Sequence, residues 1–285
     1  MEFEENLSLK KSLNLGPEEF SFFRGKIFEL AGIHLTDKKK DLVLSRLRTR
    51  VHELEFVSFG EYASYLKKLP PSHMEWELFI NFLTTNKTDW FRELDHFNFI
   101  ENEFLQKWKK LGHKNLSVWC AASSTGEEAY TLSLVLSAAL KGTGITYKII
   151  ASDIDTKVLK RAQNGVYPRD QIQTIPERFH RSFNFGTGEI SSWMKVKKEI
   201  KDPVSFKKIN LTHPLPWNDC FDLVMCRNVL IYFNPQTIKL VINNIFQTAK
   251  SESSLIIAHA ESLQNIESPW RYKGPSIYYK GIFLK

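Results

Sequence analysis

The feature that most constrains the fold is a regular alternation, after about Leu116, of short apolar runs with amphipathic stretches. The apolar runs have the length and the Val, Ile and Leu content of strands covered on both faces; they read SVWCAAS, YKIIASD, FDLVMCRN and SLIIAHA. The stretches between them have helical periodicity; they read GEEAYTLSLVLSAAL, DTKVLKRAQ and PQTIKLVINNIFQTA. This alternation predicts an α/β fold with a doubly wound, mainly parallel sheet.

The chain up to about Phe99 has a different pattern, which indicates helices alone. Apolar residues recur at helical spacing in DKKKDLVLSRLRTRVHEL, and similar stretches lie between the breakers Gly60 and Pro70-Pro71. We therefore expect an N-terminal helical domain with a linker helix over residues 1–99, and a second domain over 100–285. A basic stripe lies beside the apolar one on the first of these helices and consists of Lys39, Arg46 and Arg50. It is either a solvated face or a docking surface for an acidic partner.

One segment interrupts the alternation, at about 178–201. It contains the turn signal Gly186-Thr187-Gly188 and then the alternating run WMKVKKEI, so it predicts a small antiparallel β subdomain. Such an added edge is either decoration or a place where a peptide strand pairs. The C-terminal SIYYKGIFLK predicts a hairpin about Lys280-Gly281 that closes one edge of the sheet.

Composition narrows the environment and the partners. No apolar run is long enough to cross a bilayer, and the acidic N-terminus has no apolar signal region, so we expect a cytoplasmic protein without membrane insertion. The three cysteines and eight scattered histidines show no CxxC or HxxxH spacing, so we expect neither a disulfide framework nor a metal site. The net charge of +7 favours an acidic partner without identifying it.

The residues that follow the first apolar run indicate the kind of ligand. Ligands of such sheets bind at the carboxyl ends of the strands, where this chain has SSTGEE, with Gly126 alone and the adjacent carboxylates Glu127 and Glu128. A dinucleotide site needs GxGxxG, and carboxylates repel phosphate. S-adenosylmethionine suits the position, because it has a sulfonium, an ammonium and ribose hydroxyls but no phosphate, and Asp153 is placed to accept the ribose hydroxyls. The alternative is that the acidic pair merely stabilises the helix N-terminus.

Four stretches together resemble the bacterial chemotaxis receptor methyltransferases of the CheR type. They are NKTDWFRELDHF, WCAASSTGEEAYTLSLVL, ASDIDTKVLKRAQNGVYP and FDLVMCRNVLIYF, in the order of the family's motifs. The resemblance implies a class I S-adenosylmethionine-dependent methyltransferase domain, a small N-terminal helical domain and a β subdomain. It also implies methyl transfer to glutamate side chains of chemoreceptors, which yields glutamyl methyl esters and S-adenosylhomocysteine.

Site residues follow from the resemblance position by position. It implies cofactor contacts for Asn86, Thr88, Arg92, Glu128, Asp153, Asn210, Leu211, Arg227 and Asn228. It implies that Arg92 and Tyr232 lie nearest the reacting methyl group. The chain departs from the family pattern at Ala129, where the family commonly has proline, and in WFRE, where FFRE is frequent. It also departs in AHAESL, where the family pattern has a glycine and a serine around the histidine and the glutamate.

The resemblance also implies how the partner is recognised. In the family the cytoplasmic part of the receptor contacts the basic helix, here the one with Lys39, Arg46 and Arg50, and in some members the β subdomain captures a receptor peptide. We expect a monomer that binds no nucleic acid.

The chemistry needs few groups. A glutamate side chain has a pKa near ~4.3 and is already an ionised nucleophile at neutral pH, so no general base is needed. Arg92 has the forked guanidinium that holds a carboxylate, either that of the substrate or that of the cofactor's methionine. Tyr232 is expected to donate a hydrogen bond to a carboxylate oxygen.

Two alternatives stay open at this stage. The first is a class I methyltransferase that acts on another substrate such as RNA, gripping phosphates with its positive charge; the chain has no NPPY-like motif for a splayed base. The second is a signalling scaffold that binds S-adenosylmethionine without turnover.

Overall fold

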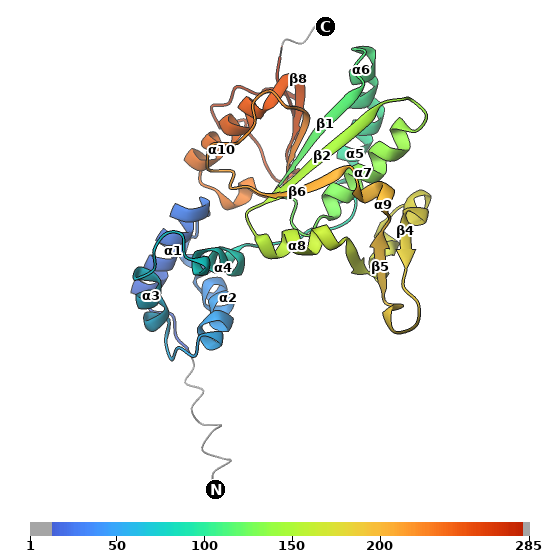
Figure 1. Cartoon of the computed structure of the whole chain (residues 1–285). Coiled ribbons are helices and arrows are strands. Elements are labelled where there is room, and N and C mark those ends of the chain that lie inside the picture. Colours follow the sequence, from blue (N-terminus) through green and yellow to red (C-terminus); the bar gives the residue numbers. More distant parts are fainter. Residues whose placement is uncertain (1–12, 282–285) are drawn as a thin grey trace. The chain divides into compact units, whose positions relative to one another are not determined.

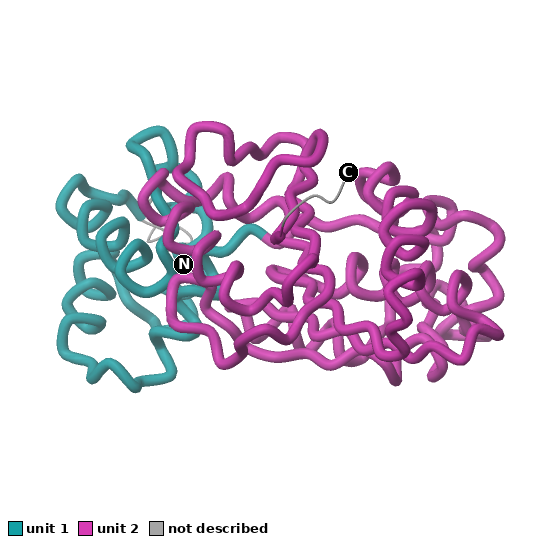
Figure 2. Tube along the Cα trace, turned by 90° about the horizontal axis from the view of Figure 1, so that it is seen from above, with its two compact units in different colours: residues 1–85 teal, residues 86–285 magenta. Residues whose placement is uncertain are grey.

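The computed structural model describes residues 13–281. The chain divides into two compact units, residues 1–85 and 86–285, which Figure 2 shows in separate colours. The expected limit at residue 99 differs from this division because the segment read as a linker helix contributes Trp90, Phe97 and Phe99 to the main core of the second unit. The domain limits stay a prediction.

The first unit is helical, as its periodicity predicts (Figure 1). Its elements are α1 (Pro17–Ala31), η2 (Asp37–Lys39), α2 (Lys40–Glu53), α3 (Phe59–Lys67) and α4 (Met74–Leu83). Helix α3 begins where the Ser58 hydroxyl accepts a hydrogen bond from the Glu61 amide. Phe23 of α1 packs against the rings of Phe59, Tyr62 and Phe79, at centroid distances of 6.3, 5.8 and 5.9 Å. This aromatic cluster joins α1, α3 and α4 into one core.

Two basic residues of α2 hold the first unit together. The Arg50 guanidinium donates to both carboxylate oxygens of Glu75, at 2.9 and 2.6 Å, and the Tyr62 hydroxyl donates to the same carboxylate at 2.8 Å. Arg46 donates to the Thr84 carbonyl at 2.6 Å, beyond the end of α4. Lys39 is exposed. Receptor docking by this stripe stays a prediction, but two of its three members have structural partners.

The second unit contains the predicted doubly wound, mainly parallel sheet, which confirms the fold class. Its strand order is β6-β2-β1-β7-β8-β10-β9, and the strands are β1 (Asn115–Ala121), β2 (Thr146–Asp153), β6 (Val204–Lys208), β7 (Phe221–Cys226), β8 (Ala249–Ile256), β9 (Arg271–Gly274) and β10 (Ile277–Tyr279). Pairs from β6 to β8 are parallel, and β10 is antiparallel to both neighbours. The connection after β1 runs to β2 on one side, and the connection after the neighbouring β7 runs to β8 on the other side, so the carboxyl ends of β1 and β7 form the switch point where ligands bind.

Helices and short turns surround this sheet. The longer ones are α7 (Glu127–Leu140), α8 (Thr156–Asn164) and α10 (Pro235–Thr248); the shorter ones are α5 (Leu94–Phe99), η3 (Ile100–Phe104), α6 (Leu105–Lys110), η4 (Arg169–Thr174), η5 (Glu177–Ser182), η6 (Gly188–Ile190), α9 (Lys198–Lys201) and η7 (Leu230–Tyr232). Side chains of β1 alternate between two cores. Val118 and Cys120 pack in one with α7, and Trp119 and Ala121 pack in the other with α10. Both faces are therefore covered, which explains the continuous apolar runs.

The antiparallel insertion is present but begins earlier than predicted. It is a three-stranded sheet in the order β3-β5-β4, made of β3 (Val166–Pro168), β4 (Phe183–Phe185) and β5 (Trp193–Val196). The predicted turn signal lies between β4 and β5. The strand at Val166–Pro168 was missed because a three-residue run carries no period.

The C-terminal hairpin also lies elsewhere. Its described strands are β9 and β10, and they turn at Pro275-Ser276 rather than at Lys280-Gly281. The second run of the predicted hairpin, residues 282–285, lies outside the described residues. Within residues 13–281 no helix combines the length and the apolar character needed to cross a membrane.

Candidate active site

The loop between β1 and α7 is shaped by its backbone. Ala122, Ser124 and Gly126 all have positive φ, of 58, 49 and 97°. A Cβ at Gly126 would lie 2.9 Å from the Ala162 Cβ and 3.0 Å from the Tyr167 hydroxyl oxygen. Only glycine suits both the backbone conformation and the space, so Gly126 lets the loop pass close to α8.

Asp153 ends β2 and is bonded to this loop. Its carboxylate accepts hydrogen bonds from the Ser124 amide at 2.8 Å and from the Asp155 amide at 3.0 Å. Burial raises the pKa of Asp153 to about 6. The carboxylate is thus fixed at the carboxyl edge of the sheet and is ionised at neutral pH.

The segment that begins at Asn86 is attached to the same edge. The side-chain nitrogen of Asn86 donates to an Asp155 carboxylate oxygen at 2.7 Å, and the backbone carbonyl of Asn86 accepts from the Ser124 hydroxyl at 2.9 Å. Thr88 is half-buried two residues further along. Residues distant in sequence from β1 and β2 therefore reach the predicted ligand edge.

The two adjacent glutamates of the loop have different environments. Glu127 is buried and accepts from the Thr125 hydroxyl at 2.6 Å, and burial raises its pKa. Glu128 accepts from Arg227 Nη1 at 2.6 Å and from the Cys120 thiol at 3.2 Å. Stabilisation of the helix N-terminus therefore does not by itself account for Glu128, whose carboxylate is bound by Arg227.

Arg227 follows β7 and joins three segments. Its side chain is 0% exposed; Nη1 donates to Glu128 at 2.6 Å, and Nη2 donates to the Arg92 carbonyl at 2.6 Å and lies 3.1 Å from Glu93 Oε2. The guanidinium thereby fixes the backbone beside Arg92 to the carboxyl ends of β1 and β7.

Asn228 and Tyr232 lie on the next turn, which Glu261 holds in place. Asn228 has a φ of 57°. The buried Glu261 carboxylate accepts from the amides of Asn228, Leu230 and Ala258, at 3.2, 2.8 and 2.8 Å. Tyr232 is half-buried at the end of η7. The sequence analysis did not select Glu261, although its position in AHAESL, after the last parallel strand, is the available signal.

Asn210 and Leu211 follow β6. The Asn210 side-chain oxygen accepts from the Thr212 amide and hydroxyl, at 3.1 and 2.8 Å, which forms a tight turn. Leu211 is buried, and its backbone carbonyl accepts from the side-chain nitrogen of Asn244 at 3.2 Å. This turn lies at the same carboxyl edge as Asp153, because β6 and β2 are parallel neighbours.

Arg92 combines a fixed backbone with an accessible side chain. Its carbonyl is held by Arg227, whereas its half-buried side chain donates from Nη1 to the Lys87 carbonyl at 3.2 Å. The sequence analysis also did not select Glu93, the next residue, which has a φ of 57° and accepts from the His259 amide at 3.1 Å.

The residues at this edge suit S-adenosylmethionine. A buried carboxylate stands at the end of β2 for the ribose, and the loop after β1 is acidic. The doubly wound sheet and this acidic edge define a class I S-adenosylmethionine-dependent methyltransferase. Residues 86–275 match the family model "CheR methyltransferase, SAM binding domain", and residues 18–84 match "CheR methyltransferase, all-alpha domain". The chain belongs to the CheR methyltransferase family.

Individual relatives agree with this assignment. The chain is 34% identical to a chemotaxis protein methyltransferase of Salmonella typhimurium, over 95% of this chain and 93% of the relative. It is 34% identical to the Escherichia coli protein of the same name, over 95% and 94%, and 35% identical to chemotaxis protein methyltransferase 2 of Pseudomonas aeruginosa, over 92% of each. A solved S-adenosylmethionine-dependent methyltransferase of Methanosarcina mazei is 16% identical over 51% of this chain and 52% of its own, with a TM-score of 0.31.

Proposed function

We propose that this chain transfers the methyl group of S-adenosylmethionine to glutamate side-chain carboxylates on the cytoplasmic part of chemoreceptors. The products are glutamyl methyl esters and S-adenosylhomocysteine. The observation that carries the proposal is the anchored Arg92, whose carbonyl is bound by the buried Arg227. A guanidinium has five N–H donors, and the one side-chain bond of Arg92 found within residues 13–281, to Lys87, leaves donors for a carboxylate.

The reaction requires orientation more than acid–base chemistry. The bound cofactor supplies a methyl group on a positively charged sulfur. The acceptor glutamate is ionised at neutral pH, so the residues of this chain need only hold it in line with that methyl group, and such positioning is worth up to ~7–11 kcal/mol. Arg92 pairs with a carboxylate, and the Tyr232 hydroxyl donates to a carboxylate oxygen and fixes its plane.

The other site residues divide into those proposed to contact the cofactor and one proposed to act indirectly. Asp153 is expected to accept the ribose hydroxyls, while five residues line the rest of the cofactor site: Asn86, Thr88, Asn210, Leu211 and Asn228. Because Arg227 is fully buried, we propose that it acts through its partners, by fixing Glu128 and the Arg92 carbonyl.

Receptor recognition is proposed for two surfaces. The β subdomain exposes Phe185, Ile190 and Trp193, which suits pairing with a receptor peptide. On α2 and the preceding turn, Lys39 is the free member of the basic stripe among the described residues, because Arg46 and Arg50 are bonded within the unit. We propose that the protein works in the cytoplasm as a monomer and does not require nucleic acid.

Transfer of a labelled methyl group tests the proposal. Pure protein is incubated with methyl-labelled S-adenosylmethionine and chemoreceptor-containing membranes from the same organism, and labelled protein is then treated with mild alkali. The expected result is base-labile label on receptor glutamates. Cofactor binding without transfer to any receptor overturns the proposal in favour of a scaffold, and label on RNA overturns it in favour of the other methyltransferase class.

A further inference from the structure

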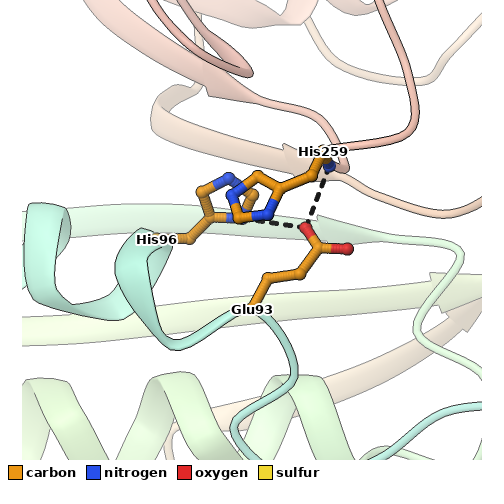
Figure 3. A group of neighbouring side chains, drawn as sticks. All are labelled: Glu93, His96 and His259. Atoms are coloured by element: carbon orange, nitrogen blue, oxygen red, sulfur yellow. Dashed lines mark hydrogen bonds and ion pairs between the residues drawn. The ribbon is translucent and has the colours of Figure 1, made fainter.

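Figure 3 shows three neighbouring side chains that could hold a metal ion, and one of them, Glu93, directly follows Arg92 in the sequence. Glu93 is the N-cap residue of α5, His96 lies in the first turn of that helix, and His259 follows β8; one ligand atom from each lies within 4.8 Å of the others. The two imidazole rings are 4.6 Å apart between centroids. Linear spacing did not reveal this group, because His259 is brought to the other two by the sheet and not by the sequence.

His96 gives an independent indication of a ligand. It is 1% exposed, and neither ring nitrogen has a hydrogen-bond partner among the described residues. Its Nδ1 lies 3.4 Å from Glu93 Oε2 without making a hydrogen bond. A buried polar group without a partner costs ~1–3 kcal/mol, so such groups in native proteins call for an explanation. A metal ion accepts a nitrogen lone pair and removes this cost.

Arg227 is the nearby cation that opposes a metal ion. Its guanidinium lies 3.1 Å from Glu93 and 2.6 Å from Glu128, so two carboxylates outnumber the one guanidinium beside this group.

We propose that Glu93, His96 and His259 bind a divalent transition-metal ion such as Zn²⁺, with water in a fourth position. Two imidazoles and one carboxylate are an established ligand set for Zn²⁺, at bond lengths of ~2.0–2.2 Å. Binding requires the ligand atoms to move closer together than they are. The exposed His259 ring, on the turn after β8, is the member free to make this movement.

Occupancy has a consequence for transfer, and this part rests on the proposed function. Glu93 Oε2 lies 3.1 Å from Arg227 Nη2 and accepts from the His259 amide. A metal ion competes with Arg227 for that carboxylate, and the same guanidinium nitrogen holds the Arg92 carbonyl. Metal binding is therefore expected to loosen Arg92 and to inhibit methyl transfer reversibly.

Calorimetric titration of ZnCl₂ into the tag-free full chain tests the site directly. All proteins carry Cys220→Ser, because this partly exposed thiol is a competing ligand. The expected result is saturable binding of one ion, weakened at least ~10-fold by His259→Ala, as the loss of one of three ligands requires. His213→Ala, which removes another exposed histidine, is the matched control and is expected to leave the affinity unchanged.

Two further readouts keep the outcome clear. Co²⁺ in place of Zn²⁺ is expected to show the absorption of a tetrahedral site in the parent chain and the His213 variant but not in the His259 variant. S-adenosylmethionine affinity of each variant, without metal, verifies that it is folded. Equal Zn²⁺ affinity in the His259 and His213 variants, or no saturable binding, overturns the site. The same proteins are assayed for methyl transfer with Zn²⁺ and then after EDTA has removed the metal. If Zn²⁺ binds but does not inhibit transfer reversibly, the metal site stands and the proposed coupling to transfer is overturned.

Discussion

Replacement of Arg227 by methionine tests whether one buried cation organises the methyl-transfer edge. In the native chain its guanidinium bonds to Glu128 at 2.6 Å and to the Arg92 carbonyl at 2.6 Å, and lies 3.1 Å from Glu93. Methionine fills much of the same volume without a donor. The variant therefore leaves two carboxylates and a carbonyl without the cation that satisfies them.

The expected loss of stability follows from this count of partners. Removal of one member of a buried ion pair typically costs ~3–5 kcal/mol, because the other charge stays buried and uncompensated. Glu93 and Glu128 are 16% and 12% exposed, so some water reaches them and the lower end of that range applies. For a unit of this size ~1 kcal/mol corresponds to ~2–4 °C in Tm. We expect the Tm of the second unit to fall by ~6–12 °C.

Scanning calorimetry at pH 7 without cofactor measures this change. The control is Lys198→Met, which breaks the 3.0 Å pair with Asp202 on the surface, where the side chains are 87% and 57% exposed. Exposed pairs contribute little to stability, so the control is expected to retain nearly the parent Tm. A fall no larger than that of the control would falsify the assignment of Arg227 as the organising cation.

Four further predictions follow from the described contacts. Because burial raises the pKa of Asp153 to about 6, cofactor affinity is expected to fall as the pH drops through 6 and to be weak and pH-independent in Asp153→Asn. The contribution of this carboxyl group to the free energy of unfolding has the opposite pH dependence. It increases as the pH falls from about 6 to 4, because the folded state binds the extra proton. Arg92→Ala is expected to reduce methyl transfer more than cofactor affinity, as titration beside turnover will show, and an equal loss of both contradicts the role near the methyl group. Glu75→Gln is expected to lower the unfolding free energy of the first unit by no more than ~3 kcal/mol, since it weakens a pair with Arg50, which is 17% exposed and keeps Glu53 as a partner. Arg50→Glu therefore tests folding. Lys39→Glu is the variant that tests receptor docking, with unchanged transfer at low salt counting against it.

The sheet was predictable from sequence because its strands are buried on both faces. Continuous apolar runs of that length have few other solutions, and β1, β2 and β7 coincide with the predicted runs, whereas β8 begins earlier and shares only residues 254–256 with the run SLIIAHA. The insertion was predictable only in part. Its turn is indicated by the local sequence Gly186-Thr187-Gly188. The pairing of Val166–Pro168 with Trp193 to Lys195 depends instead on tertiary contacts, which leave no pattern in the local sequence.

The site was predictable where a residue follows a strand, and less so where it serves other residues. Asp153 follows from the end of an apolar run and the rule that ligands bind there. Glu93 and Glu261 were missed because their carboxylates accept backbone amides of distant turns. Those turns depend on positive φ at Glu93 and Asn228; asparagine adopts this conformation more often than most residue types, whereas glutamate gives no such signal.

The distribution of charge explains how a basic protein selects a cationic cofactor. Carboxyl groups gather at the carboxyl edge of the sheet, and the guanidinium of Arg227 is bonded among them; those of Asp153, Glu127 and Glu261 are buried, and those of Glu93 and Glu128 are half-buried. A phosphate-bearing dinucleotide is repelled there, whereas a sulfonium and an ammonium are stabilised. The net charge of +7 belongs instead to surface lysines and arginines, and a positive surface favours an acidic partner. The chain therefore combines an acidic ligand edge with a basic surface.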